Sequence, residues 1–160
     1  MSSLQQPEIV NRPDFKLAGL KLRTGNEQDE IKELWRQFGE RAEELRGVAE
    51  TLDAYGAIDN FDEEKGEFDY LASVMLRDGE EAPEGMEVWQ VLAQNYAVFP
   101  TSLATLMDTI DAIYGSWMPG SNYRRAPGPE FELYGEAFDP ADSDSTFHLY
   151  IPVEPLAGGE

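Results

Sequence analysis

The sequence contains no cysteine and a single histidine, His148. The lack of cysteine excludes disulfides, thiolate nucleophiles, iron–sulfur clusters and zinc sites built on sulfur. Because His148 has no second histidine with which to share a metal, we interpret it as a half-exposed strand residue. We therefore expect no metal site and no cofactor.

Basic residues are also scarce, with 12 Lys and Arg against 32 Asp and Glu, which gives a net charge of −20. Binding to free nucleic acid needs clustered basic side chains, and the only adjacent basic pair is Arg124-Arg125. This excludes DNA as a direct partner. The acidity itself has two interpretations, namely ordinary solubility or adaptation to a salty cytoplasm in which ions screen the repulsion.

No apolar run reaches the roughly 18 residues of a membrane span, and residues 1–7 are neither basic nor apolar. We expect a cytoplasmic protein without a signal peptide or membrane contact. The chain also lacks a nucleophile elbow and a phosphate-binding glycine loop. The acidic stretch 139–144 lacks the ligand spacing of a calcium loop, so we interpret it as a turn.

The 160 residues, of which 41% are hydrophobic, are enough for one domain with its own core. The same order of elements occurs twice along this domain. The first half predicts a strand, a helix capped by Asn26 and two more strands, at 15–22, 29–45, 55–61 and 68–76. After a linker at 79–85, the second half predicts an apolar run, a helix starting near Thr101 or Ser102 and two strands, at 88–99, 101–117, 131–138 and 147–153.

The two predicted helices carry apolar stripes that match after a shift of 72 positions. The first stripe consists of Ile31, Leu34, Trp35, Phe38, Ala42 and Leu45, and the second of Leu103, Leu106, Met107, Ile110, Tyr114 and Trp117. The stripe assigns Trp35 to the core. We predict an α+β fold of duplicated β-α-β-β halves, about 8–80 and 86–153, followed by a tail at 154–160. The halves form one sheet with two main helices and a central ligand cleft.

The tetrapeptide Phe131-Glu132-Leu133-Tyr134 places a carboxylate between aromatic residues in a predicted strand. Because strand side chains alternate, Glu132 and Tyr134 share one face of the sheet, and the other two residues share the core face. The acid and the phenol then lie either on a solvated surface or on the floor of an aromatic pocket. Since Glu is seldom buried without a partner, the sequence favours the solvated surface.

Five stretches in order, at 66–72, 96–99, 113–119, 128–134 and 150–153, resemble the GyrI-like small-molecule-binding domain. The same module is the effector-binding domain of many AraC-type and MerR-type regulators. The resemblance covers about residues 7–153. It implies a cleft that binds hydrophobic, often cationic, aromatic compounds.

The resemblance also implies roles for individual residues in that cleft. Glu132 matches the cleft carboxylate of the family, and Tyr70, Trp117 and Tyr134 match positions near the cleft. The predicted ligand-binding set also includes Trp89, Tyr55 and Phe99. For Tyr70, Tyr55 and Trp89, packing in the core is an equally good interpretation.

Three functions remain open at this stage. The first is a stand-alone protein that senses or sequesters a small molecule, because little sequence precedes the first predicted strand for a DNA-binding domain. The second is a hydrolase of strained electrophiles with Glu132 as general base. The third is a protein partner that inhibits a DNA-handling enzyme such as gyrase. Monomer and dimer both remain open.

Overall fold

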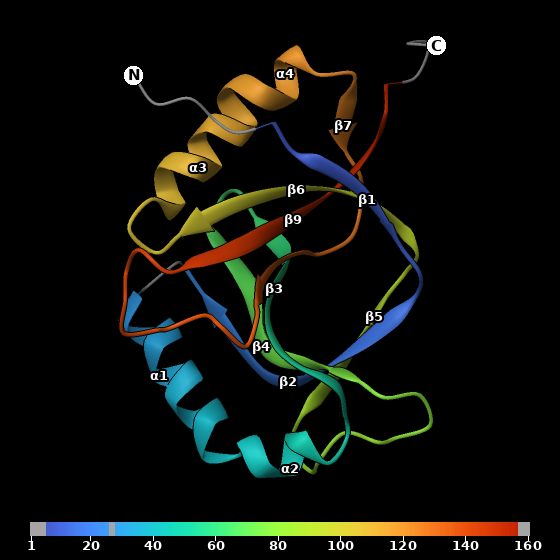
Figure 1. The fold of residues 1–160 in the computed structure, drawn as a ribbon, viewed down its shortest axis with the longest axis vertical. Coiled ribbons are helices and arrows are strands. Elements are labelled where there is room, and N and C mark those ends of the chain that lie inside the picture. The colour runs from blue at the N-terminus through green and yellow to red at the C-terminus, as the bar shows by residue number, and fades with distance from the viewer. Residues whose placement is uncertain (1–5, 26–27, 157–160) are drawn as a thin grey trace.

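The computed structural model describes residues 6–25 and 28–156 (Figure 1). Within these residues the elements occur in an order that repeats. The first half contains β1 (Glu8–Arg12), β2 (Phe15–Thr24), α1 (Gln28–Glu40), α2 (Ala42–Arg46), β3 (Ala49–Asp62) and β4 (Glu67–Leu76). The second half contains β5 (Glu87–Val91), β6 (Gln94–Ser102), α3 (Leu106–Ala112), a π-helical turn η1 (Ile113–Trp117), α4 (Met118–Gly120), β7 (Tyr123–Arg125), β8 (Glu130–Tyr134) and β9 (Thr146–Pro155).

All the strands belong to one curled antiparallel sheet whose order is β1-β6-β9-β8-β3-β4-β2-β5, with β7 paired to β9. Strands β3 and β8 lie side by side at the centre, so the two halves meet there. One strand of each half also pairs with a strand of the other half, namely β1 with β6 and β5 with β2. The result confirms the predicted α+β fold of two similar halves.

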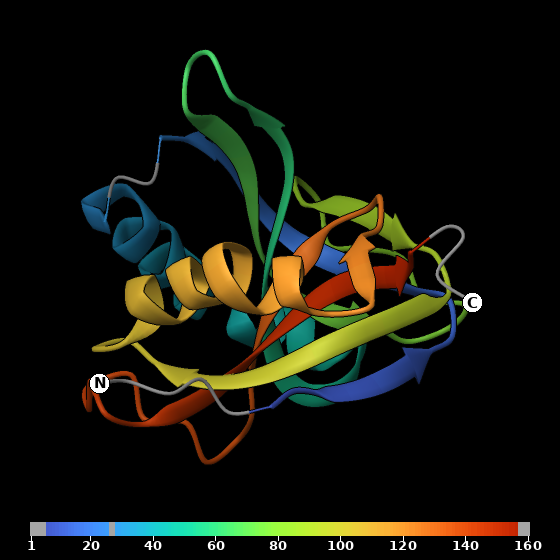
Figure 2. The ribbon, with the colours of Figure 1, turned by 90° about the horizontal axis from the view of Figure 1, so that it is seen from above.

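The sheet has two faces of different character. We call the face covered by α1 and α3 the helix face, and Figures 1 and 2 show both helices lying over it. Helix α1 packs on residues of β2, β3 and β4, and α3 with η1 packs on residues of β6 and β9. The opposite face carries a separate core built around Phe15, Tyr55, Tyr96 and Phe131.

Helix α1 carries only the first part of the predicted apolar stripe, because the predicted helix 29–45 is broken at Arg41 and the last two stripe residues, Ala42 and Leu45, lie in α2. Ile31, Leu34, Trp35 and Phe38 pack on the sheet, while its charged side chains Glu33, Arg36 and Glu40 pair with one another at the surface. This arrangement is the amphipathic pattern that places a helix on a sheet. The predicted cap, Asn26, lies outside the described residues.

The prediction for the second helix was wrong at its start and on its buried face. The helix begins at Leu106, because Thr101 and Ser102 remain in β6 and pair with β9. Leu103 and Met107 of the predicted stripe are exposed, as is Tyr114. The side chains that face the sheet are Leu106, Thr109, Ile110, Ile113 and Trp117. These match the first five residues of the first stripe, Ile31 to Ala42, after a shift of 75 rather than 72 positions.

Three smaller differences concern the strands. The apolar run 88–99 is broken into β5 and β6 at Leu92 and Ala93, and β8 ends at Tyr134 rather than at residue 138. Strand β9 continues to Pro155, into the predicted tail, because β7 pairs with its last residues. Residues 157–160 of that tail lie outside the described residues.

Candidate functional site: a buried carboxylate between two tyrosines

The register of the central strands brings an acid and two phenols together on the helix face. Glu132 in β8 lies opposite Gly56 in β3, and Gly56 lies opposite Ala72 in β4. Because Gly56 has no side chain, the ring of Tyr70 can cross β3 and reach Glu132. A Cβ atom at position 56 would lie 2.7 Å from Oε1 of Glu132 and still closer to the Tyr70 hydroxyl. The glycine is therefore required for this contact.

Hydrogen bonds connect these side chains in a short chain. The hydroxyl of Tyr70 donates to Oε1 of Glu132 at 2.7 Å, and the hydroxyl of Tyr134 donates to the same oxygen at 2.6 Å. Nε1 of Trp35 in α1 donates to the Tyr70 hydroxyl at 3.0 Å. Both phenols therefore act as donors toward one carboxylate oxygen, and the indole supports one of them from the helix.

Glu132 is buried, with 6% of its surface exposed, so the expected solvated sheet surface is wrong. Helix α1 covers this part of the sheet, and the phenols supply the partners that a buried carboxylate needs. Burial raises the pKa of Glu132, and the hydrogen bonds from Tyr134 and Tyr70 oppose that rise. Burial, together with the negative charge of Glu132, raises the pKa of both phenols well above the usual tyrosine value.

Trp35 has a part in the site that the sequence did not reveal. Its ring lies edge-on to Tyr134, with ring centroids 5.6 Å apart, and edge-on to Phe38 at 5.1 Å. The stripe position predicted a plain core residue, yet Trp35 is half-buried and covers the Tyr70–Glu132 pair. The one available signal was the indole N–H, which needs a partner when a tryptophan is placed on a core stripe.

Trp117 and Phe99 of the predicted set lie on the helix face but under the other helix. Their rings are 5.2 Å apart, in the core below α3 and η1. Tyr134 connects this core to the acid, because its ring packs on Phe147 at 4.6 Å while its hydroxyl bonds to Glu132. Trp117 and Phe99 thus border the site rather than contact the carboxylate.

Tyr55 and Trp89 do not belong to the same site as Glu132. Both lie on the opposite face of the sheet, where Tyr55 is buried and Trp89 packs against that core. The guanidinium of Arg12 lies over the rings there and donates to the Tyr55 hydroxyl at 3.1 Å. The alternation of strand side chains places them there, so the alternative interpretation as packing residues fits both.

The described residues contain no group of three His, Cys, Asp or Glu that could hold a metal ion. His148 is exposed in β9, opposite Pro100 in β6. Within the same residues, no helix is both long and apolar enough to cross a membrane.

Two similar halves in one curled sheet, with a helix over each half and an acid between them, define an effector-binding domain of the GyrI-like type. The family model of integron-associated effector-binding proteins (Cass2) matches residues 8–153, and the chain belongs to this family. The transcriptional regulator BrlR of Pseudomonas aeruginosa is 33% identical over 148 residues. That match covers 91% of this chain but 54% of BrlR, so the chain spans about half of that relative.

Two solved structures share the fold. The structure of SAV2435 bound to tetraphenylphosphonium has a TM-score of 0.74 at 17% identity, covering 94% of each chain. An integron cassette protein of Vibrio cholerae, VCH_CASS2, has a TM-score of 0.65 at 22% identity, covering 94% of this chain and 97% of its own. The family model and the match to BrlR confirm the resemblance to a GyrI-like domain, and these structures confirm its fold.

Proposed function

We propose that the protein binds a hydrophobic organic cation, with Glu132 as its counter-ion on the helix face. One observation carries this proposal. Glu132 is 6% exposed, and its carboxylate forms no ion pair with any basic side chain of the described residues. A cationic ligand would supply the positive charge that this buried carboxylate lacks.

The energetics favour a cation over a neutral ligand. An ionised carboxylate away from water is costly, and two phenol hydrogen bonds offset only part of that cost. A bound cation would supply the missing charge, and each well-placed aromatic face would add about 0.5 to 2 kcal/mol. Tyr70, Tyr134 and Trp35 are the nearest such rings. A neutral ligand of the same shape gains neither contribution.

Access to Glu132 requires Trp35 to move. The indole donates to Tyr70 and lies against Tyr134, so it occupies the space above the acid. The ion pairs of Arg36 on α1 stay within the helix, to Glu33 and Glu40, and apolar packing holds this part of the helix on the sheet. We infer that a ligand displaces the Trp35 side chain and shifts α1 outward, and that apolar contact with the ligand replaces the lost packing.

The relatives support a small-molecule ligand. The protein SAV2435 has been solved with tetraphenylphosphonium, a hydrophobic aromatic cation, and shares this fold. BrlR is a transcriptional regulator that is about twice as long as the match. We propose that binding in this protein serves to sense or sequester such compounds in the cytoplasm.

The test compares a cation with a neutral compound of similar shape. We expect methyltriphenylphosphonium to bind better than triphenylphosphine oxide, in which an oxygen replaces the methyl group, in calorimetric titrations of the parent protein. Glu132→Gln should remove most of that difference, which amounts to about 1 to 3 kcal/mol for a charge-assisted contact. The control Glu130→Gln changes the next acid along β8, whose carboxylate pairs with Arg125 and Tyr114, and should keep the preference. An equal preference in Glu132→Gln and the parent would remove Glu132 from the site.

A second candidate function is hydrolysis with Glu132 as general base, and the raised pKa of this carboxyl favours it. Under this hypothesis Glu132→Gln abolishes product formation from strained electrophiles while uncharged substrates still bind. Equal turnover in the parent and the variant would rule out catalysis by Glu132. Absence of turnover in both would leave the binding function.

A further inference from the structure

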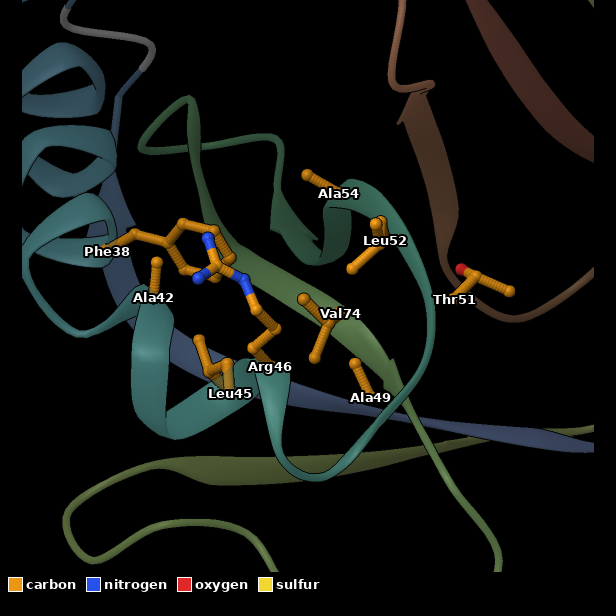
Figure 3. A pocket seen from close by; sticks show the side chains of 9 residues that line it. All are labelled: Phe38, Ala42, Leu45, Arg46, Ala49, Thr51, Leu52, Ala54 and Val74. Atoms are coloured by element: carbon orange, nitrogen blue, oxygen red, sulfur yellow. The ribbon is translucent and has the colours of Figure 1, made fainter.

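A hollow of about 190 Å³ lies on the helix face where α2 and the end of α1 meet β3 (Figure 3). Leu45 and Val74 are buried and form its base, and Phe38 forms the wall toward α1. Leu52 stands at the rim with 61% of its surface exposed. The hollow therefore presents apolar surface that the protein itself leaves uncovered.

The hollow results from an irregularity in β3. The pairing of β3 with β4 jumps from Ala49–Leu76 to Ala54–Val74, so the residues between Ala49 and Ala54 leave the ladder. Such bulges re-aim side chains and occur next to functional sites. Arg77 fixes this one, because its guanidinium donates to the carbonyl oxygen of Ala49 at 2.9 Å. A hydrogen bond therefore holds the backbone beside the hollow in place, so the hollow is a fixed feature of the fold.

A guanidinium lies over this apolar surface. Arg46 of α2 extends across the hollow toward the ring of Phe38 (Figure 3). Its ion pair among the described residues is with Glu43, at 3.9 Å, and the Glu43 side chain is 93% exposed. Exposed pairs of this kind contribute little and are easily exchanged. Most donors of Arg46 therefore remain available to a ligand, and a guanidinium binds a carboxylate through two parallel hydrogen bonds.

We propose that this hollow is a second small-molecule site, which takes small aromatic carboxylates such as phenylacetate. A cavity of about 150 Å³ lined by apolar side chains holds benzene, so the hollow has room for one ring. The ring would lie against Leu45, Leu52 and Val74, and the carboxylate would meet Arg46. This hollow would therefore prefer an anionic ligand, whereas the site at Glu132 would prefer a cationic one. The two sites are neighbours, because Phe38 of this hollow packs on Trp35.

Amide chemical shifts in two-dimensional NMR spectra test the proposal on the whole chain. Titration with phenylacetate should give saturable shifts in the millimolar range or below at the hollow, and phenylacetamide should bind at least about tenfold more weakly. Arg46→Gln should remove this preference. The matched control is Arg36→Gln, which alters an exposed arginine of α1 paired with Glu33 and Glu40, and should keep it.

Two more variants separate this site from the other. Leu52→Glu places an acid at the exposed rim and should abolish binding of phenylacetate without disturbing the core. Glu132→Gln should leave binding of phenylacetate unchanged, since the site does not depend on the cation site. Shifts that map away from the hollow, equal affinity for the acid and the amide, or an unchanged preference in Arg46→Gln would each overturn the proposal.

Discussion

Replacing Gly56 with alanine should disrupt the candidate site without removing any polar group. The added methyl group would lie 2.7 Å from Oε1 of Glu132 and closer still to the Tyr70 hydroxyl, against at least about 3.5 Å for an ordinary contact. Because strand β3 is central and cannot retreat, the ring of Tyr70 has to move. Its hydrogen bonds to Glu132 and from Trp35 are then lost.

The expected loss of stability has two parts. Overpacking in a core costs about 1 to 3 kcal/mol, and a buried group that loses a hydrogen bond costs about 1 to 3 kcal/mol more. We expect Gly56→Ala to lower the free energy of unfolding by about 2 to 5 kcal/mol in urea titrations, after allowance for partial relaxation. For a chain of this size each kcal/mol lowers the melting temperature by about 2 to 4 °C. Affinity for organic cations should fall as well.

The control is Gly39→Ala in α1, where a Cβ atom would meet nothing within 4 Å. It should be neutral or stabilise by up to about 1 kcal/mol, because alanine is the better helix former. Combining Gly56→Ala with Tyr70→Phe removes the hydroxyl nearest the new methyl, so the double variant should lose less stability than the two single losses together. A Gly56→Ala protein as stable as the parent, with unchanged affinity for cations, would refute the reasoning.

Three further outcomes follow from the structure. Trp35→Phe removes the donor to Tyr70 and should lower the free energy of unfolding in urea by about 0.5 to 1.5 kcal/mol. The same variant should raise the association rate of the cation in stopped-flow experiments, whereas the control Trp117→Phe should leave that rate unchanged. Screening the repulsion of 32 carboxylates should raise the melting temperature between low and molar NaCl, and a flat curve would leave the acidity as ordinary solubility. Burial raises the pKa of Glu132 in the folded protein. The contribution of Glu132 to stability is therefore complete below the carboxyl pKa of the unfolded chain and is lost as the pH rises through the folded pKa. Glu132→Gln should reduce this fall in the free energy of unfolding with pH.

Local patterns in the sequence were sufficient for part of the fold. Alternation placed Glu132 and Tyr134 on one face, and the apolar stripe of α1 identified its buried side. Both are properties of short segments, set by the strand and helix periods. The exchange of β1 and β5 between the halves is not such a property, because it depends on pairing between segments far apart in the chain.

The errors have the same origin in long-range contacts. The sequence predicts a helix start near Thr101 or Ser102, yet pairing with β9 keeps both residues in a strand. Glu132 reads as a solvated side chain, yet α1 covers it and Tyr70 reaches it across Gly56. Trp35 was predicted to be a core residue because the apolar stripe shows which face of the helix is buried. The stripe does not show which polar group accepts a hydrogen bond from the indole. For the candidate site, strand alternation grouped Glu132 with Tyr134 and the family resemblance added Tyr70, but neither indicated that Trp35 covers them.

The number of protons released on binding tests most directly whether Glu132 is the counter-ion. Burial raises the pKa of Glu132, and a bound cation favours the ionised carboxylate, so ligand binding should lower that pKa and release protons. Calorimetric titrations with tetraphenylphosphonium, in buffers of different ionisation enthalpy, should show release that is largest at acidic pH and vanishes as the pH rises. Glu132→Gln should show none. Binding to the parent without proton release at any pH, or equal release in the variant, would contradict the proposed role of Glu132.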